Sequence, residues 1–162
     1  SDLGVTTFLR REKDIIDWVK TTPSQATWQA SNLNEADVWG WESYLKTRLN
    51  ERLQFTTQYT YNNKERDKQG YQYKYGQNYY RHLLSMVFNL SFSAFTEDVS
   101  FVYKKRPSRR GWWLVNSRLA KPLNKNAQVF LAITNLFNVE YQEIEGIAQP
   151  GRSFQIGCRW EW

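Results

Sequence analysis

The chain has 162 residues and a net charge of +6, with 41% hydrophobic and 17% aromatic residues. This length suits a single domain, and no apolar run approaches the roughly 18 residues that a membrane-spanning helix needs. A low mean hydropathy does not exclude a membrane protein, because the strands of a membrane β-barrel give half of their residues to a polar lumen. The single cysteine, Cys158, excludes an internal disulfide.

The first segment runs from about Leu3 to Val19 and is rich in β-forming residues. Its middle part, Arg10 to Asp14, is charged on both faces, as expected of a strand that leaves the membrane before it turns. Lys20 to Thr27 contains Pro23 and is predicted to be a loop. The return segment, Trp28 to Asn50, alternates near its end, with Trp39, Trp41, Leu45 and Leu49 on one face and Gly40, Glu42, Lys46 and Arg48 on the other.

The clearest alternation lies in the middle of the chain. Apolar or aromatic residues alternate with polar ones from Leu53 to Asn62, and again from Tyr80 to Phe92. Asn63 to Asn78, between these two segments, is predicted to be a long polar loop, and Ala94 to Asp98 a short turn. In the second segment one face carries Leu84, Met86, Phe88, Leu90 and Phe92, and the other carries Ser85, Val87, Asn89, Ser91 and Ser93.

Three more strands are expected before the C-terminal motif. Val99 to Tyr103 leads to a basic connection, Lys104 to Gly111, and Trp113 to Leu119 leads back. A short turn marked by Pro122 separates this strand from Val129 to Ile133.

The last segment, Phe154 to Trp162, has one apolar and aromatic face and one small or charged face. Exposed apolar surface of this kind needs a partner or a membrane to cover it. A lipid-facing barrel strand meets that need, because such strands alternate apolar-out and polar-in and carry aromatic girdles. We therefore expect the following residues on the convex, lipid-facing side: Phe88, Leu90, Phe154, Ile156 and Trp160.

These segments amount to about eight strands joined as consecutive hairpins. The short connections follow Asn50, Phe95 and Pro122, and the long ones lie near Thr21, Lys68 and Glu145. The connection at Arg106 is intermediate in length and strongly basic. Short periplasmic turns that alternate with longer external loops are typical of outer-membrane barrels. The predicted fold class is all-β: one antiparallel transmembrane β-barrel segment over residues 1–162, with its C-terminus on the periplasmic side.

Three motifs carry a family resemblance. The most specific is Asn135-Leu136-Phe137-Asn138, followed by Tyr141, by Pro150-Gly151-Arg152 and by the alternating strand that ends in Trp162. The others are Gly40-Trp41-Glu42 and Phe8 to Trp18, which is similar to an F-x-R-x-x-x-D-x-I strand. Together these motifs resemble the barrel of TonB-dependent outer-membrane receptors, in the family's order and approximate spacing.

The resemblance implies the C-terminal wall of a barrel of about 22 strands with a plugged lumen. Such receptors lie in the outer membrane of Gram-negative bacteria and take up scarce large solutes, namely siderophores, haem or vitamin B12. The vitamin B12 and siderophore branches look closest. Energy comes from TonB through a plug domain. This chain matches neither the plug domain nor the N-terminal barrel strands and shows no signal-peptide pattern, so we expect a fragment or a processed product.

The resemblance also implies structural roles for the motif residues and further partners. Gly40 and Glu42 are expected on an inward face. Trp162 is expected either as a girdle residue where hydrocarbon meets water or as the terminal aromatic that the barrel-assembly machinery recognises. Outer-membrane lipid is expected around the apolar face. The remaining motif residues are expected where strands leave and re-enter the wall: Asn135, Leu136, Phe137, Tyr141, Pro150, Gly151 and Arg152.

The chain offers little for catalysis. His82, its only histidine, falls by parity on an apolar face and is interpreted as an interfacial residue rather than a ligand. Cys158 is most simply a small lipid-facing hydrophobe. One His and one Cys give no metal cluster of known spacing, and no phosphate loop or G-x-S-x-G motif is present. We expect neither enzymatic activity nor a cofactor.

The basic connection admits two interpretations. Basic residues interleaved with aromatics such as Trp112 and Trp113 bind phosphates and stack on bases in nucleic-acid-binding proteins. At the tip of an external hairpin they would instead meet the phosphates of lipopolysaccharide, or solvent, and this interpretation is preferred. No nucleic-acid partner is expected, and the candidate lipopolysaccharide contacts are Lys104, Lys105, Arg106, Arg109 and Arg110.

Two other classes of protein remain open. Eight strands also match the smallest closed outer-membrane barrels, which have structural or adhesive roles and interiors filled by side chains. In that case Arg48, Arg118 and Arg159 would crowd a narrow lumen that has few acidic partners. A soluble nucleic-acid-binding β protein has only the basic and aromatic connection in its favour. A fully bonded ladder between the first and last strands would favour the small barrel, and an open curved sheet the larger one.

Overall fold

The computed structural model describes residues 1–161 except residues 33–34, 67–71, 75–78, 108 and 145. All regular secondary structure in this part of the chain is β-strand. None of the described residues belongs to a helix long and apolar enough to cross a membrane. Trp162, the expected terminal aromatic, lies outside the described residues.

Eleven strands follow one another along the described residues. Their bounds are β1 (Asp2–Lys13), β2 (Ile16–Lys20), β3 (Gln29–Asn32), β4 (Glu35–Arg48), β5 (Leu53–Arg66), β6 (Gln72–Tyr73), β7 (His82–Ser91), β8 (Thr96–Lys105), β9 (Trp112–Pro122), β10 (Ala127–Thr134) and β11 (Ser153–Trp160).

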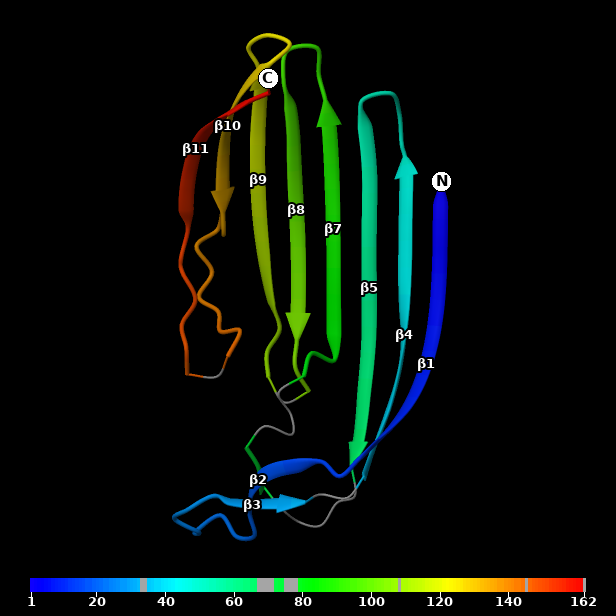
Figure 1. The fold of residues 1–162 in the computed structure, drawn as a ribbon, viewed down its shortest axis with the longest axis vertical. Helices are drawn as coiled ribbons and strands as arrows, with labels where there is room; N and C mark the ends of the chain where they lie inside the picture. The colour runs from blue at the N-terminus through cyan, green and yellow to red at the C-terminus, as the bar shows by residue number, and fades with distance from the viewer. Residues whose placement is uncertain (33–34, 67–71, 75–78, 108, 145, 162) are drawn as a thin grey trace.

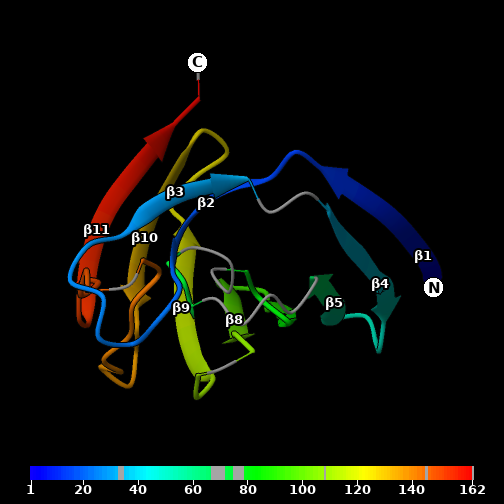
Figure 2. The ribbon, with the colours of Figure 1, turned by 90° about the horizontal axis from the view of Figure 1, so that it is seen from below.

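Eight of these strands form one antiparallel sheet, in the order β1-β4-β5-β7-β8-β9-β10-β11. The order in the sheet follows the order in the chain once β2, β3 and β6 are set aside, so the sheet is a meander (Figure 1). Figure 2 shows that this sheet curves into an arc with β1 and β11 at its two ends. Among the described residues these two edge strands do not pair with each other. The predicted eight-stranded antiparallel meander is confirmed, and the sheet is open.

A second, three-stranded sheet has the order β3-β2-β6. It joins two connections that are distant in sequence, because β2 and β3 lie between β1 and β4, whereas β6 lies between β5 and β7. This small sheet lies at the end of the main sheet where the long connections gather (Figure 1). Seen from below, β2 and β3 cross the open side of the arc (Figure 2).

The strand register aligns apolar residues across the whole main sheet. Trp41 of β4 lies opposite Thr7 of β1 and Tyr61 of β5, and Leu131 of β10 lies opposite Leu119 of β9 and Ile156 of β11. Paired residues of neighbouring strands share a face of the sheet. The apolar face, as we call it, therefore includes Leu3, Val5, Leu9, Trp39, Trp41, Leu45, Phe55, Tyr59, Tyr61, Leu84, Met86, Phe88, Leu90, Phe101, Tyr103, Trp113, Leu119, Leu131, Ile133, Phe154, Ile156, Cys158 and Trp160.

The apolar face is largely uncovered. Ile156 is 83% exposed, Leu9 80% and Phe154 66%. Soluble monomers rarely expose apolar surface that extends over so many strands. Few apolar side chains among the described residues are buried, and they do not form a continuous core: Val19, Ala36, Val38, Val115 and Ala120.

The opposite face of the main sheet, called the polar face, carries hydroxyl, amide and charged side chains. The Asn89 amide donates to the Asp98 carboxylate over 2.7 Å. The Asn116 amide donates to the Ser100 hydroxyl over 3.1 Å. These bonds join neighbouring strands. Because alternate residues point to opposite faces, one face holds polar groups that hydrogen-bond to one another and the other holds the apolar side chains.

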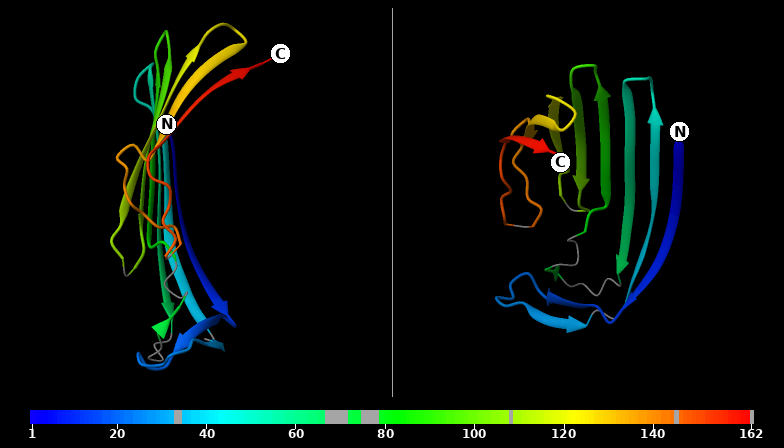
Figure 3. Two further views of the ribbon diagram at one scale, coloured as in Figure 1. Left: turned by 90° about the vertical axis from the view of Figure 1, so that its left-hand side faces the viewer. Right: turned by 45° about the horizontal axis from the view of Figure 1, so that its top comes forward.

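The connections alternate in length as predicted. Residues 49–52, 92–95 and 123–126 form short turns at one end of the sheet, and the longer connections lie at the other end (Figure 1). Figure 3 shows the same division from the side and from a tilted view. The predicted start of a loop at Asn63 is wrong, because β5 continues to Arg66 and pairs there with Ala36 of β4. Polar composition marks where a strand leaves an apolar environment, whereas backbone pairing continues past that point.

Aromatic residues concentrate on the apolar face towards the long connections. Ring centroids lie 5.4 Å apart in Trp39 and Tyr61, 4.9 Å apart in Trp41 and Tyr59, and 4.8 Å apart in Tyr103 and Trp113. His82 belongs to the same group: its Nδ1 lies 2.7 Å from the Tyr59 hydroxyl, and its ring centroid lies 5.3 Å from that of Tyr61. The placement of His82 on the apolar face is confirmed. These seven residues are called the aromatic band.

Candidate functional site

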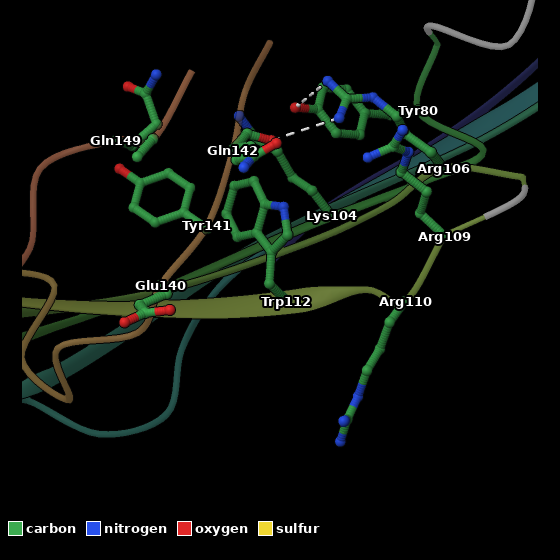
Figure 4. Close-up of a pocket in the computed structure, with 11 residues that line it drawn as sticks. Tyr80, Lys104, Arg106, Arg109, Arg110, Trp112, Glu140, Tyr141, Gln142 and Gln149 are labelled. Carbon is green, nitrogen blue, oxygen red and sulfur yellow. Dashed lines mark hydrogen bonds between the residues drawn. The ribbon is translucent and has the colours of Figure 1, made fainter. Parts of the chain in front are cut away.

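A cavity of about 640 Å³ lies among the long connections. Three connections bound it: the residues just before β7, the connection between β8 and β9, and the connection between β10 and β11. Figure 4 shows these residues converging from separate parts of the chain. The lining residues are Tyr80, Lys104, Arg106, Arg109, Arg110, Trp112, Glu140, Tyr141, Gln142, Ala148 and Gln149.

The first motif residue, Asn135, folds the connection that bounds this cavity. Asn135 is only 3% exposed and has a φ of 52°, in the left-handed region that asparagine tolerates better than most residues. Its side-chain oxygen accepts from the Val139 amide over 2.8 Å, and its side-chain nitrogen donates to the Val139 carbonyl over 2.9 Å and to the Pro150 carbonyl over 3.4 Å. One buried side chain therefore ties the beginning of the connection to its end.

The same connection is attached to the wall of the sheet. The Asn135 amide donates to the Asn116 side-chain oxygen of β9 over 2.9 Å. The Leu136 amide donates to the Val115 carbonyl over 2.8 Å. The connection is thus fixed against β9 before it reaches the cavity.

Asn138 and the Pro-Gly-Arg motif close the connection. Asn138 has a φ of 54°, and its side-chain oxygen accepts from the Arg152 amide over 2.8 Å. A Cβ atom on Gly151 would lie 2.6 Å from that oxygen, so a larger residue would displace the contact. The motif residues therefore have a local role: they hold both ends of the connection. Between those ends Glu143 bonds Lys104 of β8, the Gln142 carbonyl accepts from Arg106, and Tyr141 packs against Trp112 of β9.

Glu143 is the acidic centre of the cluster beside the cavity. Its Oε1 accepts from the Lys104 ammonium over 2.6 Å, and its Oε2 accepts a short hydrogen bond from the Tyr80 hydroxyl. Lys104 comes from the end of β8 and Tyr80 precedes β7. This carboxylate therefore joins three segments that are distant in sequence.

Arg106 lies deeper and is only 9% exposed. Its guanidinium donates to the Tyr80 hydroxyl over 3.1 Å, to the Gln142 carbonyl over 3.4 Å and, by a shorter bond, to the Glu143 carbonyl. Its Nε is buried, and it has no hydrogen-bond partner among the described residues. The guanidinium also lies 4.6 Å above the centroid of the Tyr80 ring.

The electrostatics of the cluster keep the proton on Tyr80. Burial, reinforced by the bond to the Glu143 carboxylate, raises the pKa of Tyr80 to about 12. Burial alone would raise the pKa of Glu143, but the hydrogen bonds from Lys104 and Tyr80 outweigh it, and the Glu143 pKa is lowered from its ordinary value. At neutral pH the cluster therefore contains an ionised Glu143 and a neutral tyrosine.

Aromatic rings form the other wall of the cavity. The rings of Trp112 and Tyr141 lie with centroids 4.7 Å apart and planes at 47°. The Lys104 ammonium lies 5.3 Å from the Trp112 centroid and 5.2 Å from the Tyr80 centroid. The cavity thus combines flat apolar surfaces with positive charge.

The structure separates the predicted site residues into groups. Gly40 and Glu42 lie on the polar face of β4, far along the sheet from the cavity, and a Cβ on Gly40 would lie 2.0 Å from the Tyr61 carbonyl oxygen. Tyr141 lines the cavity, whereas Phe137 is 69% exposed. β10 ends at Thr134, one residue before Asn135, and β11 begins at Ser153, one residue after Arg152.

The five predicted lipopolysaccharide contacts do not share one surface. Lys104, Arg106, Arg109 and Arg110 line the cavity, and Figure 4 shows Arg110 pointing away from the other lining residues. Lys105 lies opposite His82, and its register therefore places it on the apolar face beside the aromatic band.

Sequence reasoning missed Tyr80, Trp112, Gln142 and Glu143 as members of one site. Glu143 lies 63 residues from Tyr80 and 39 residues from Lys104 in the chain. The alternation in connection length could have indicated which connections lie at the same end, but not which side chains meet there. The described residues contain no group of three or more His, Cys, Asp or Glu side chains that could hold a metal ion.

Comparison with known proteins gives matches only among solved structures. No protein-family model matches the chain, and no curated protein matches it. The chain is similar to the pyoverdine outer membrane receptor FpvA from Pseudomonas aeruginosa PAO1, with 14% identity over 98% of this chain and 27% of that one, and a TM-score of 0.74. It is also similar to the copper transporter OprC, with 13% identity over 99% of this chain and 29% of that one, and a TM-score of 0.78.

A third similar structure is the siderophore receptor PirA from Pseudomonas aeruginosa, with 18% identity over 98% of this chain and 26% of that one, and a TM-score of 0.66. The chain thus spans between a quarter and a third of the length of these three structures. At such identities the likeness shows the fold. The fold of this chain is that of a C-terminal barrel portion of TonB-dependent receptors, and the resemblance read from the sequence is confirmed at this level.

Proposed function

We propose that this chain forms part of the wall of an outer-membrane β-barrel in a Gram-negative bacterium. The observation that carries the proposal is the apolar face, which continues across all eight strands and leaves Ile156 83% exposed. Lipid would cover this face, and the polar face would line the lumen. The aromatic band then marks the outer interface, because amphipathic rings are favoured where hydrocarbon meets water.

The wall belongs to a barrel larger than eight strands. The sheet is an open arc, with β1 and β11 unpaired to each other in the described residues. Open edges do not persist in hydrocarbon, because each unsatisfied backbone group costs several kcal/mol. Further strands of a larger barrel would pair with both edges, which favours a receptor of about 22 strands over a small autonomous barrel.

We further propose that the complete protein takes up a scarce large solute with energy delivered through TonB. Support comes from the likeness in fold to a siderophore receptor, a pyoverdine receptor and a copper transporter. A siderophore is the preferred solute, and haem and vitamin B12 are the alternatives. TonB would act through a plug domain, the barrel-assembly machinery would insert the wall, and the role is transport rather than catalysis.

We propose that lipopolysaccharide lies next to the aromatic band, on the lipid-facing side of the barrel. Lys105 is the basic residue whose register places it beside the aromatic band on the apolar face. At that depth its ammonium would reach phosphates of the outer leaflet.

The proposal is tested with the full-length protein in a Gram-negative host that lacks its own copy. We expect the protein in the outer-membrane fraction, and uptake of one labelled ferric siderophore from a panel only when TonB is functional. Haem and cobalamin are measured in the same way. Uptake that continues without TonB, or a protein found in the soluble fraction, would contradict the proposal.

A further inference from the structure

The cavity has more positive than negative charge. Lys104, Arg106, Arg109 and Arg110 line it, with Glu140 as the one acidic residue among the described lining residues. Glu143 adds a second carboxylate at its side, bonded to Lys104 and Tyr80. Positive charge gathered in a concave site raises the local concentration of anions.

Arg106 shows that this charge is incompletely matched. Its hydrogen-bond acceptors among the described residues are a tyrosine hydroxyl and two backbone carbonyls, all of them neutral. The nearest carboxylate, that of Glu143, is joined to it through the Tyr80 hydroxyl rather than by a direct ion pair, and the positive charge of Arg106 helps to lower the Glu143 pKa. A guanidinium that is nine-tenths buried, with its Nε unpartnered, is costly unless an anion compensates it.

Glu143 occupies the place where such an anion would bind. Its carboxylate accepts from the Lys104 ammonium and from the Tyr80 hydroxyl, and its own backbone carbonyl accepts from Arg106. Yet Glu143 belongs to the connection between β10 and β11, which is held at its ends by Asn135 and Asn138. A rearrangement of the Glu143 side chain would leave these end contacts in place.

The walls of the cavity favour a flat ligand. Trp112 and Tyr141 present rings with centroids 4.7 Å apart, and Tyr80 adds a third ring flanked by Lys104 and Arg106. The cavity volume of about 640 Å³ lies within the range of pockets that hold small organic molecules. Aromatic rings stack on conjugated ligands, and ammonium and guanidinium groups bind their carboxylates.

We propose that the cavity binds a small planar organic anion, an aromatic carboxylate, and that Glu143 is a resident competitor which the ligand must displace from Lys104 and Tyr80. The inference rests on the proposed function only in taking the cavity as open to an incoming solute. Displacement of Glu143 releases the centre of the connection between β10 and β11. Binding at the cavity is thereby linked to a change in an outer connection.

A purely structural role for Glu143 makes the opposite prediction. If the carboxylate only held the cavity in shape, its removal would loosen Lys104, Tyr80 and the connection, and anion binding would weaken. If the carboxylate competes with the ligand, only the fraction of molecules with an unoccupied site can bind the anion. Removing the carboxylate then raises the apparent affinity for the anion by the inverse of that fraction.

The test uses calorimetric titration of the full-length protein in detergent with benzoate as the anionic probe and benzamide as its neutral counterpart. Glu143→Gln is expected to bind benzoate about tenfold or more tightly than the parent, within the usual range of coupling between ligands. Benzamide affinity is expected to change little. The matched control is Glu140→Gln, which removes the same charge from the cavity lining without removing a hydrogen bond to Lys104 or Tyr80.

Equal gains in benzoate affinity in Glu143→Gln and Glu140→Gln would show that only the net charge of the cavity matters, and would overturn the proposal. A loss of benzoate affinity in Glu143→Gln would overturn it as well. Tyr80→Phe keeps the ring and removes one of the two bonds to the carboxylate, so a smaller gain for benzoate is expected. It remains informative if Glu143→Gln fails to fold, which thermal unfolding would reveal. Loss of TonB-dependent uptake with the tighter benzoate binding intact would overturn the proposed transport and leave this inference standing.

Discussion

The apolar face and the cavity are built by different rules. The apolar face arises from a simple repeat, an apolar residue at every second position of each strand. The strand register then places the apolar residues of neighbouring strands opposite one another. The cavity uses each residue once: Glu143, Lys104 and Tyr80 come from three segments and meet through individual hydrogen bonds.

This contrast explains how the two regions should respond to change. A single substitution on the apolar face alters transfer free energy at that position and leaves its neighbours in place. A substitution in the cavity removes a partner from several groups that are partly buried. The first kind of effect should depend on the face of the sheet, and the second on the connection involved.

The largest expected effect comes from a charge on the apolar face. Ile156→Arg should destabilise the full-length protein by about 2–4 kcal/mol if this residue lies near the bilayer midplane. Gln155→Arg, one residue away on the other face, should be mild. Folding into lipid vesicles followed by denaturant titration measures both variants. Equal losses would break the assignment of the two faces.

The next effect concerns the polar face, where backbones approach closely. Gly40→Ala would place a Cβ 2.0 Å from the Tyr61 carbonyl oxygen and 2.7 Å from the Phe8 ring. Separating β4 from β5 should cost about 1–3 kcal/mol, as in other overpacked sites. Gly4→Ala is the control, since no atom lies within 4 Å of its new Cβ. A Gly40→Ala protein as stable as Gly4→Ala would show that the sheet yields at this position.

The sheet could be predicted from the sequence because its signal is local and repeated. The run Leu84, Met86, Phe88 and Leu90 shows its face without knowledge of any partner strand, and the register then confirms it. The alternation of short and long connections added the direction of the chain. Prediction failed where polarity and pairing diverge, as at Asn63, which still pairs with Trp39.

The cavity could be predicted only in part. The motif Asn135 to Asn138 was identified by resemblance, but its physical role depends on bonds to Val139, Pro150 and Arg152 that only the folded connection shows. The basic connection was identified from composition, but composition could not show that its Arg106 is buried and donates to a hydroxyl and two backbone carbonyls. Such pairings depend on how separate connections fold together, and a single sequence carries no periodic signal for that.

A third prediction separates the connection from the sheet. Asn135→Ala removes three side-chain hydrogen bonds and places alanine at a φ of 52°, so a cost of about 1–2 kcal/mol is expected. Hydrogen exchange should increase in residues 136–152 and stay unchanged in β9 and β10. The control, Asn124→Ala, loses one bond in an exposed turn and should change stability by about 0.5 kcal/mol or less. Faster exchange throughout the sheet in Asn135→Ala would remove the distinction between the two regions.

The smallest effect, and the one most specific to the cavity, is the titration of Tyr80. Its pKa is raised from 10.0 to about 12 by burial and by the Glu143 carboxylate. A raised pKa means that the folded protein holds this proton when the unfolded chain has released it, so the stabilising contribution is complete below pH 10.0 and declines as the pH rises towards about 12. Difference titration of the parent and Tyr80→Phe by tyrosinate absorbance should show one tyrosine that ionises near its raised pKa of about 12.

Glu143→Gln should lower the pKa of Tyr80, because it removes the negative charge that opposes ionisation. A Tyr80 that ionises near its ordinary pKa in the folded parent would show that the hydroxyl is not buried beside the Glu143 carboxylate in solution.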